Sequence, residues 1–335
     1  MDEIKNGLSL FFGVLKSKKK DIFKSFFVFA LCLVVFTLMQ FPFADLNDFL
    51  TKQIYQNSNR MVYAQFENID IGLFPFPSFE AQKVTINSKG MPSIKANKML
   101  LSPSPIDLVN ILVKHAPSLS KVELDGFLNA SIEGSLNYEG NTEDGSPKHK
   151  IQLEAQSLSL SDLQPFLSLP FSLGGSVDAR IEALVTFDLS EQPDGDIELS
   201  SKDITLPSIT IPTAIGAVTL PTLKFSKLNL KGRMNDSRLY IEELELGGPS
   251  DPLQLKVKGD SGFYFKQGRG ASPVVVENFK IKIQLDVSSE MQSSLYFISL
   301  LDEFKKNGTQ GNSRYLFRVS GRNLQNPDIS DLSSF

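Results

Sequence analysis

The chain has 335 residues, of which 41% are hydrophobic and 21% are charged, and its formal net charge at pH 7 is -4. These values are typical of a globular protein and exclude an intrinsically disordered chain. The weakly negative charge excludes the electrostatic footprint of a nucleic-acid-binding protein, and the single cysteine, Cys32, excludes a disulfide within the chain.

The first feature along the chain is an uncharged stretch, residues 26–43. At ~1.5 Å per residue, a helix of this length nearly crosses a ~30 Å hydrocarbon core, so we predict a transmembrane helix over residues 22–44. A cleaved signal peptide and a buried core helix remain open as alternatives. The apolar residues expected to anchor the helix in the bilayer are Phe26, Phe29, Leu33, Phe36 and Phe43.

Charge is distributed unequally on the two sides of this stretch. Lysines precede it, whereas Asp45 and Asp48 follow it directly. That asymmetry predicts a cytoplasmic N-terminal tail over residues 1–21, a single membrane span, and export of everything that follows. The lysines that set this orientation are Lys16, Lys18, Lys19, Lys20 and Lys24.

From about residue 62 the chain consists of short runs in which apolar and polar residues alternate, which is typical of an all-β region. The clearest alternation covers residues 122–138. It indicates either one very long bent strand or two strands that fold back near Asp125 and Gly126.

The alternation also changes phase within single strands. It shifts by one residue between Ala155 and Leu158, and again between Phe225 and Leu228. A β-bulge absorbs such a shift while it keeps the apolar side chains on one face, so we expect bulges at both places.

A short strand motif recurs in which two apolar residues, spaced two apart, are followed in phase by a glycine. The glycine then falls on the apolar side of the strand, where a missing side chain permits strong coiling or close approach. We interpret these glycines as candidates for lining a groove: Gly134, Gly232, Gly259 and Gly321.

Helical patterns are few in the β-rich region. They cover residues 104–114, 161–167 and 289–306, the last with a capping box predicted from Ser289 and Gln292. The proline-spaced residues 206–221 indicate an edge strand or a connection. We therefore predict a first half of the β domain over residues 45–205 and a second half over residues 206–335.

Strands with one apolar face greatly outnumber the helices available to cover them. Such a sheet must curl on itself, pack in two layers, or leave apolar surface for a ligand or partner. We predict a mainly β fold: an N-terminal transmembrane helix followed by a strongly curled, mostly antiparallel sheet that forms a groove or half-barrel, with about three short helices.

Residues that carry chemistry are scarce. His115 and His149 have no neighbour at metal-ligand spacing, and neither a phosphate-binding loop nor a GxSxG nucleophile motif is present. We therefore predict no catalytic, cofactor-binding or metal-binding residues, and no enzymatic activity.

Several segments occur in an order that is similar to that of a known family. They are residues 74–79 (FPFPSF), 98–104 (KMLLSPS), 163–167 (LQPFL), 170–175 (PFSLGG) and 317–327 (FRVSGRNLQNP). In this order the chain resembles the type II secretion system protein N (GspN) family. That family is similar to the AsmA-like proteins, which anchor one helix in the inner membrane and extend a curled β-sheet into the periplasm.

The resemblance implies a non-enzymatic component of a type II secretion system, anchored in the inner membrane with the bulk of the chain in the periplasm. Its expected partners are inner-membrane lipids and other proteins of the secretion apparatus, without nucleic acid or a cofactor. The alternative is an AsmA-like lipid-binding or lipid-transfer module, whose ligands would be lipid acyl chains held in an apolar β groove.

Overall fold

The computed structural model divides the chain into two units, Met1–Leu50 and Thr51–Phe335. The residues that it describes are 28–29, 33, 43–57, 62–72, 78–88, 92–114, 118–167, 172–186, 190–213, 216–265, 274–306, 312–323 and 327–335. Within the first unit, residues 28, 29 and 33 are helical, as is the beginning of α2 (Phe43–Asn57). The second unit contains every described strand.

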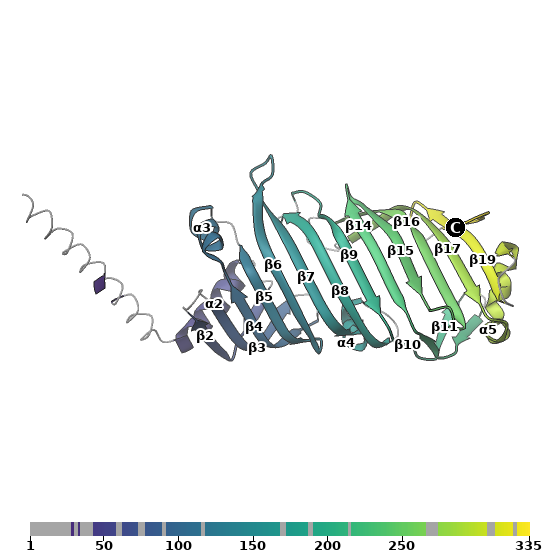
Figure 1. The fold of residues 1–335 in the computed structure, drawn as a ribbon, viewed down its shortest axis with the longest axis horizontal. Helices are drawn as coiled ribbons and strands as arrows, with labels where there is room; N and C mark the ends of the chain where they lie inside the picture. Colours follow the sequence, from purple (N-terminus) through teal and green to yellow (C-terminus); the bar gives the residue numbers. More distant parts are fainter. Residues whose placement is uncertain are drawn as a thin grey trace, which may run out of the picture. The chain divides into compact units, whose positions relative to one another are not determined.

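The strands of the second unit follow one another with few helices between them (Figure 1). The first nine are β1 (Val62–Gln65), β2 (Asn68–Gly72), β3 (Ser78–Ser88), β4 (Ile94–Ser102), β5 (Leu119–Phe127), β6 (Ala130–Asn141), β7 (Pro147–Ser159), β8 (Gly174–Thr186) and β9 (Asp194–Ser201). The others are β10 (Ile204–Leu206), β11 (Ile209–Thr213), β12 (Gly216–Leu220), β13 (Leu223–Phe225), β14 (Leu228–Asn235), β15 (Arg238–Leu246), β16 (Leu253–Phe265), β17 (Val274–Val287), β18 (Lys305–Lys306), β19 (Ser313–Gly321) and β20 (Asp328–Asp331).

Antiparallel pairing joins these strands into one large sheet. From β3 to β9 each strand pairs with the next, β9 pairs with β14, and pairing continues through β15, β16 and β17 to β19. At one edge both β1 and β2 pair with β3, and at the other both β18 and β20 pair with β19. Because β9 and β14 are neighbours, strands from both sides of residue 206 belong to the same sheet.

Between β9 and β14 the chain forms an arm, residues 204–225. Its strand β10 pairs with β13 and with the first two residues of β8. Among the described strands, β11 and β12 pair only with each other, and they form the tip of the arm.

Two hairpins illustrate how the local sequence determines the turns. Leu128 and Asn129 join β5 to β6, and Asp236 and Ser237 join β14 to β15; all four have φ between 49° and 60°. A two-residue loop with φ > 0 at both positions matches the twist of the flanking strands. Residues 122–138 are therefore two strands, and their turn lies beyond the predicted position near Gly126.

Of the two predicted bulges, the first is confirmed and the second is wrong. The pairing of β7 with β8 shifts register between Ala155 and Leu158, where Ser157 has a φ of 59°, which confirms the bulge. Between Phe225 and Leu228 the strand is interrupted instead, because β13 of the arm ends there and β14 begins.

The helices of the second unit are short. They are α3 (Pro105–Lys114), α4 (Leu160–Leu167), α5 (Ser289–Ser294) and the 3-10 helix η1 (Tyr296–Phe304), in addition to the end of α2. The prediction of one helix over residues 289–306 is wrong. Its cap is Ser288, whose hydroxyl accepts from the Met291 N–H at 3.2 Å, and the helix breaks at Leu295. Burial of Leu295 and Ile298 against the sheet accompanies the tighter 3-10 winding.

The prediction of a strongly curled sheet forming a groove or half-barrel is also wrong, although the mainly β, antiparallel character is confirmed. The sheet is an open row of strands (Figure 1). Among the described strands, neither β1 nor β2 at one edge pairs with β20 at the other. Strong curling requires bulges and glycine kinks repeated from strand to strand. Here register shifts occur in the pairings from β5 to β8 and from β14 to β17, whereas the pairings of β8 with β9, β9 with β14, and β17 with β19 run without any, so the kinks are not repeated across the whole sheet.

The predicted transmembrane helix is not found in the described part of the chain. Among the residues that the structure describes, no helix is long and apolar enough to cross a membrane. Most of residues 22–44 lies outside the described residues.

Candidate apolar binding face

The register of the sheet places apolar residues of successive strands directly opposite one another. One such row crosses from β6 to β19, and over roughly 38 Å, which is eight spacings of ~4.8 Å, it contains no polar side chain. The row consists of Ile132, Ala155, Ala179, Leu199, Leu230, Leu244, Val257, Ile283 and Phe317. We call the side of the sheet that carries this row the apolar face.

A second row lies two residues farther along the same strands, or three on β15 where the register shifts, and contains three of the four predicted glycines. It consists of Gly134, Leu153, Ile181, Ile197, Gly232, Ile241, Gly259, Ile281 and Val319. The fourth glycine, Gly321, lies opposite Phe279, one row beyond. The structure thus brings Gly134, Gly232 and Gly259 onto one line across the apolar face.

The surroundings of these glycines explain why no side chain is present. A Cβ atom at Gly134 would lie 2.4 Å from the backbone oxygen of Gln152, and one at Gly259 would lie 2.3 Å from that of Lys280. At Gly232 the nearest atom would be a methyl group of Ile197, at 3.1 Å. Gly134 and Gly259 therefore allow neighbouring backbones to approach closely. A leucine there would clash whether or not a ligand occupies the face, and the role of these glycines in ligand binding stays a prediction.

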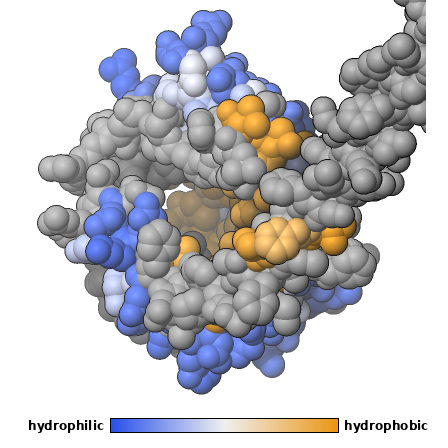
Figure 2. All heavy atoms as spheres, turned by 90° about the vertical axis from the view of Figure 1, so that its left-hand side faces the viewer, coloured by the Kyte–Doolittle hydropathy of each residue, from blue (hydrophilic) through white to orange (hydrophobic). Residues whose placement is uncertain are grey.

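Much of the apolar face is only partly buried. In the first row, Ala155, Val257 and Phe317 are buried, whereas Ile132, Leu199, Leu230, Leu244 and Ile283 retain contact with solvent. Figure 2, which views the molecule from the left-hand side of Figure 1, shows a hollow with hydrophobic residues on its visible wall and hydrophilic residues on the outer surface. An apolar surface of this kind is typical of a binding site.

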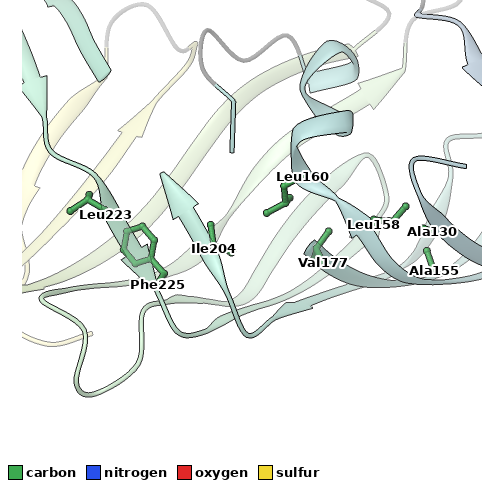
Figure 3. Packing of buried hydrophobic residues seen from close by; sticks show 8 residues of the cluster. All are labelled: Ala130, Ala155, Leu158, Leu160, Val177, Ile204, Leu223 and Phe225. Atoms are coloured by element: carbon green, nitrogen blue, oxygen red, sulfur yellow. The ribbon is translucent and has the colours of Figure 1, made fainter. Parts of the chain in front are cut away.

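Among the residues that the structure describes, two groups of buried side chains mark where the apolar face is covered. The first lies beneath α4 and the arm, and its side chains come from β6, β7, β8, α4, β10 and β13 (Figure 3). It consists of Ala130, Ala155, Leu158, Leu160, Val177, Ile204, Leu223 and Phe225. The second lies beneath α5 and η1 and consists of Val287, Leu295, Ile298, Phe304, Tyr315 and Phe317.

Between these two groups lies a cavity of about 510 Å³, lined by apolar side chains alone. The sheet contributes Leu228, Leu246, Leu253 and Leu285; the arm contributes Ile204, Leu206, Leu220, Leu223 and Phe225; the flanking segments contribute Leu160, Leu173, Leu295 and Ile298. Its volume falls within the range of about 300–1,000 Å³ that is usual for small-molecule sites. Leu230, Leu244 and Ile283 each lie two positions from a cavity residue on the same strand, so the cavity and the first row are adjacent.

The arm is attached to the sheet by hydrogen bonds at both of its ends. The carboxylate of Asp251, in the loop between β15 and β16, accepts from the N–H of Ser226 at 2.7 Å, from its hydroxyl at 2.9 Å and from the Gly248 N–H at 2.7 Å. Burial raises the pKa of Asp251, but these hydrogen bonds outweigh it, so the pKa lies below its usual value. At the other end, the Ser201 hydroxyl donates to the Ser176 carbonyl at 2.5 Å.

The opposite face of the sheet is charged. Ion pairs cross it from strand to strand, as between Lys150 and Glu182 at 2.5 Å. Glu245 accepts from both Lys227 and Lys256, at 2.5 Å and 2.7 Å, and these hydrogen bonds lower the pKa of its carboxyl to about 2. This charged face is therefore exposed to water, and the two faces of the sheet differ sharply in polarity.

The helix α3 buries the carboxylate of Asp107. Asp107 is 3% exposed and accepts hydrogen bonds from the Ser104 N–H at 2.7 Å, the Ser118 hydroxyl at 2.5 Å, and both the N–H, at 2.9 Å, and the hydroxyl of Ser120. Burial raises the pKa of Asp107, but these hydrogen bonds outweigh it and hold the pKa at about 2. Ser104 also caps the helix, since its hydroxyl accepts from the Asp107 N–H at 3.3 Å.

Few of the residues predicted to anchor and orient the chain in the membrane belong to the part that the structure describes. Phe29 and Leu33 are helical, and their exposed fractions are 64% and 53%. Phe43 is the first residue of α2. The remaining anchor residues, Phe26 and Phe36, lie outside the described residues, as do the orientation lysines Lys16, Lys18, Lys19, Lys20 and Lys24.

The sequence did not identify the cavity. Part of its lining comes from Leu206, Leu220 and Leu223, in a segment that the prolines indicated to be an edge strand or a connection. The available signal was the concentration of leucines beside Pro207 and Pro221, because a solvated connection carries few large apolar residues.

No known protein family, curated protein or solved structure matches this chain. In the part of the chain that the structure describes, no group of three His, Cys, Asp or Glu side chains lies close enough together to hold a metal ion. Function is therefore inferred from the geometry and sequence of this chain itself.

Proposed function

We propose that this protein is a non-enzymatic binding protein for the acyl chains of lipids, which occupy the apolar face of the sheet and the cavity beneath the arm. The observation that supports this proposal is the cavity of about 510 Å³ with a wholly apolar lining, adjacent to a row of apolar residues that crosses nine strands.

The chemistry of the cavity restricts what it can hold. No polar atom is available there to compensate a charged or hydrogen-bonding group, so a lipid headgroup must remain outside. Each methylene taken from water contributes ~0.8 kcal/mol, and ten of them contribute on the order of 8 kcal/mol before the cost of immobilising the chain. A hydrocarbon chain is the ligand that fits these constraints best.

Native mass spectrometry of the full-length protein tests this proposal. We expect co-purifying lipid on the wild type and its loss from Leu253→Phe, because the larger ring fills the cavity. Gln254→Phe is the matched control, since Gln254 is the next residue of β16 and its side chain bonds to the Pro249 carbonyl instead. Thermal unfolding of Leu253→Phe should remain close to the wild type; if it does not, Leu206→Phe serves as the second cavity-filling variant. Wild-type protein without lipid would contradict the proposal.

A second proposal, from the sequence, is that the protein is a component of a type II secretion system, anchored in the inner membrane with its sheet in the periplasm. The observation that favours it is the order of the segments at residues 74–79, 98–104, 163–167, 170–175 and 317–327. Deletion of the gene should reduce secretion of exported enzymes, and cross-linking should capture inner-membrane components of the apparatus. Unchanged secretion together with no cross-link would exclude this role.

A further inference from the structure

The helix α3 has the reverse of the usual arrangement of polar and apolar residues. Its polar residues Asp107 and Asn110 are 3% and 8% exposed, whereas Ile106, Val109 and Val113 are 73%, 54% and 71% exposed. A surface helix normally buries its apolar stripe and presents charged residues to water. Spacings of three and four residues place Ile106, Val109 and Val113 on one side of the helix, and we call them the α3 stripe.

The α3 stripe is held in this orientation. The carboxylate of Asp107 accepts hydrogen bonds from Ser104, which precedes the helix, from Ser118, which precedes β5, and from Ser120 within β5. Rotation of the stripe toward the protein would break these bonds and expose the carboxylate. In Figure 1, α3 lies at the rim of the sheet, where it connects β4 to β5.

The size of the α3 stripe restricts its partner. Three aliphatic side chains bury on the order of 100 Å² of apolar surface apiece, or roughly 300 Å² together. A stable interface between two protein copies requires about 800 Å² from each partner. A second copy of this chain is therefore a poor match, whereas a lipid bilayer needs no complementary shape and accepts a short apolar stripe at its surface.

The charges of α3 favour the same partner. Asp107 is the only acidic residue of the helix, and it is buried. The only basic residue is Lys114, the last residue of α3. Outside its buried carboxylate the helix carries no negative charge that anionic headgroups would repel.

We infer that α3 inserts the side chains of Ile106, Val109 and Val113 into the surface of a lipid bilayer. This inference does not depend on the apolar face or on the cavity. It gives the chain a membrane contact that lies within the β-rich unit.

Site-specific fluorescence on the full chain, reconstituted into vesicles of phosphatidylethanolamine and phosphatidylglycerol, tests the inference. Cys32→Ser removes the single cysteine, after which Ile106→Cys, Val109→Cys or Val113→Cys carries an environment-sensitive dye. The control is Glu198→Cys, on the charged face of β9, where the side chain is also exposed. Because all three stripe positions are exposed, a variant that fails to fold can be replaced by another, and thermal unfolding identifies it.

We expect a blue-shifted emission at the stripe positions and several-fold stronger quenching by nitroxide-labelled lipid acyl chains than at residue 198. A blue shift that lipid-borne nitroxide does not quench would show that protein covers the stripe, and would overturn the inference. Emission typical of water, quenched by iodide as strongly as at residue 198, would overturn it as well.

Discussion

The Ser118 hydroxyl donates a hydrogen bond of 2.5 Å to the carboxylate of Asp107, and this bond joins the first turn of α3 to the residue that precedes β5. Both side chains are buried, with exposed fractions of 1% and 3%. A buried charge with several donors fixes an element more strictly than apolar packing does, because each lost donor leaves an unpaired group. The orientation of α3 therefore depends on one carboxylate.

Replacement of that carboxylate should be costly. We expect Asp107→Ala to lower the free energy of unfolding by roughly 2–3 kcal/mol, since it removes charged hydrogen bonds and leaves the buried Ser118 hydroxyl without this acceptor. Asp162→Ala is the matched control, because Asp162 also lies in a first helical turn but bonds to Asn129 in an exposed pair. Its cost should stay below about 1 kcal/mol. Equal losses in chemical denaturation would contradict this account of Asp107.

The depressed pKa values predict a loss of stability in acid. The carboxyls of Asp107 and Glu245 have pKa values of about 2 in the folded chain, against 3.8 and 4.5 for the free groups. Because the folded values are lower, the stabilisation is complete above pH 4.5 and is lost as the pH falls toward 2. We expect the free energy of unfolding to decline over this range, and to decline less in Asp107→Asn. Stability that stays constant down to pH 2 would contradict the assignment.

Alanine substitutions should distinguish glycines that lie close to a neighbouring backbone from a glycine that has room for a side chain. Gly134→Ala and Gly259→Ala place a Cβ atom against the backbone of the neighbouring strand, and we expect each to cost roughly 1–3 kcal/mol. Gly174→Ala is the control, because its Cβ would meet Thr205 at an ordinary 3.4 Å. That variant should be neutral or stabilising by up to about 1 kcal/mol. Thermal unfolding measures the stability of all three variants. Unchanged stability of Gly134→Ala would show that β6 and β7 are farther apart than the 2.4 Å approach implies.

The attachment of the arm should control its local opening. Asp251→Asn weakens the acceptor for the Ser226 N–H and hydroxyl, and we expect roughly 1–2 kcal/mol less protection against hydrogen exchange in residues 204–225. Protection in β6 and β7 should not change. If exchange increases uniformly over the sheet, Asp251 stabilises the whole fold and not the arm in particular.

Much of the fold could be predicted from the sequence because strand alternation is a local property. The apolar phase of Gly134 and the bulge after Ala155 each depend on residues close in the chain. The coverage of the apolar face could not be predicted in the same way. It depends on β9 pairing with β14 across the arm, which no local pattern encodes.

The same distinction explains the result for the candidate site. The position of each glycine on the apolar side was predictable because it continues the alternation of apolar residues in its own strand. The cavity combines side chains such as Leu160, Leu223 and Leu285 from separate elements, and each of them alone resembles an ordinary core leucine. The predicted helix over residues 289–306 failed for a related reason, since α5 ends at Leu295, whose burial against the sheet is a long-range contact that the local pattern does not encode.

Photocross-linking in living cells tests lipid binding most directly, because it requires neither detergent nor purification. A photoreactive phenylalanine analogue at position 253, within the cavity, should form covalent adducts with lipid that mass spectrometry identifies. The same analogue at position 254, on the opposite face of β16, should form few. Lipid adducts at residue 253 in clear excess over residue 254 are the result we predict. Equal adducts at both positions, or none at residue 253, would contradict the proposal that the apolar cavity holds acyl chains.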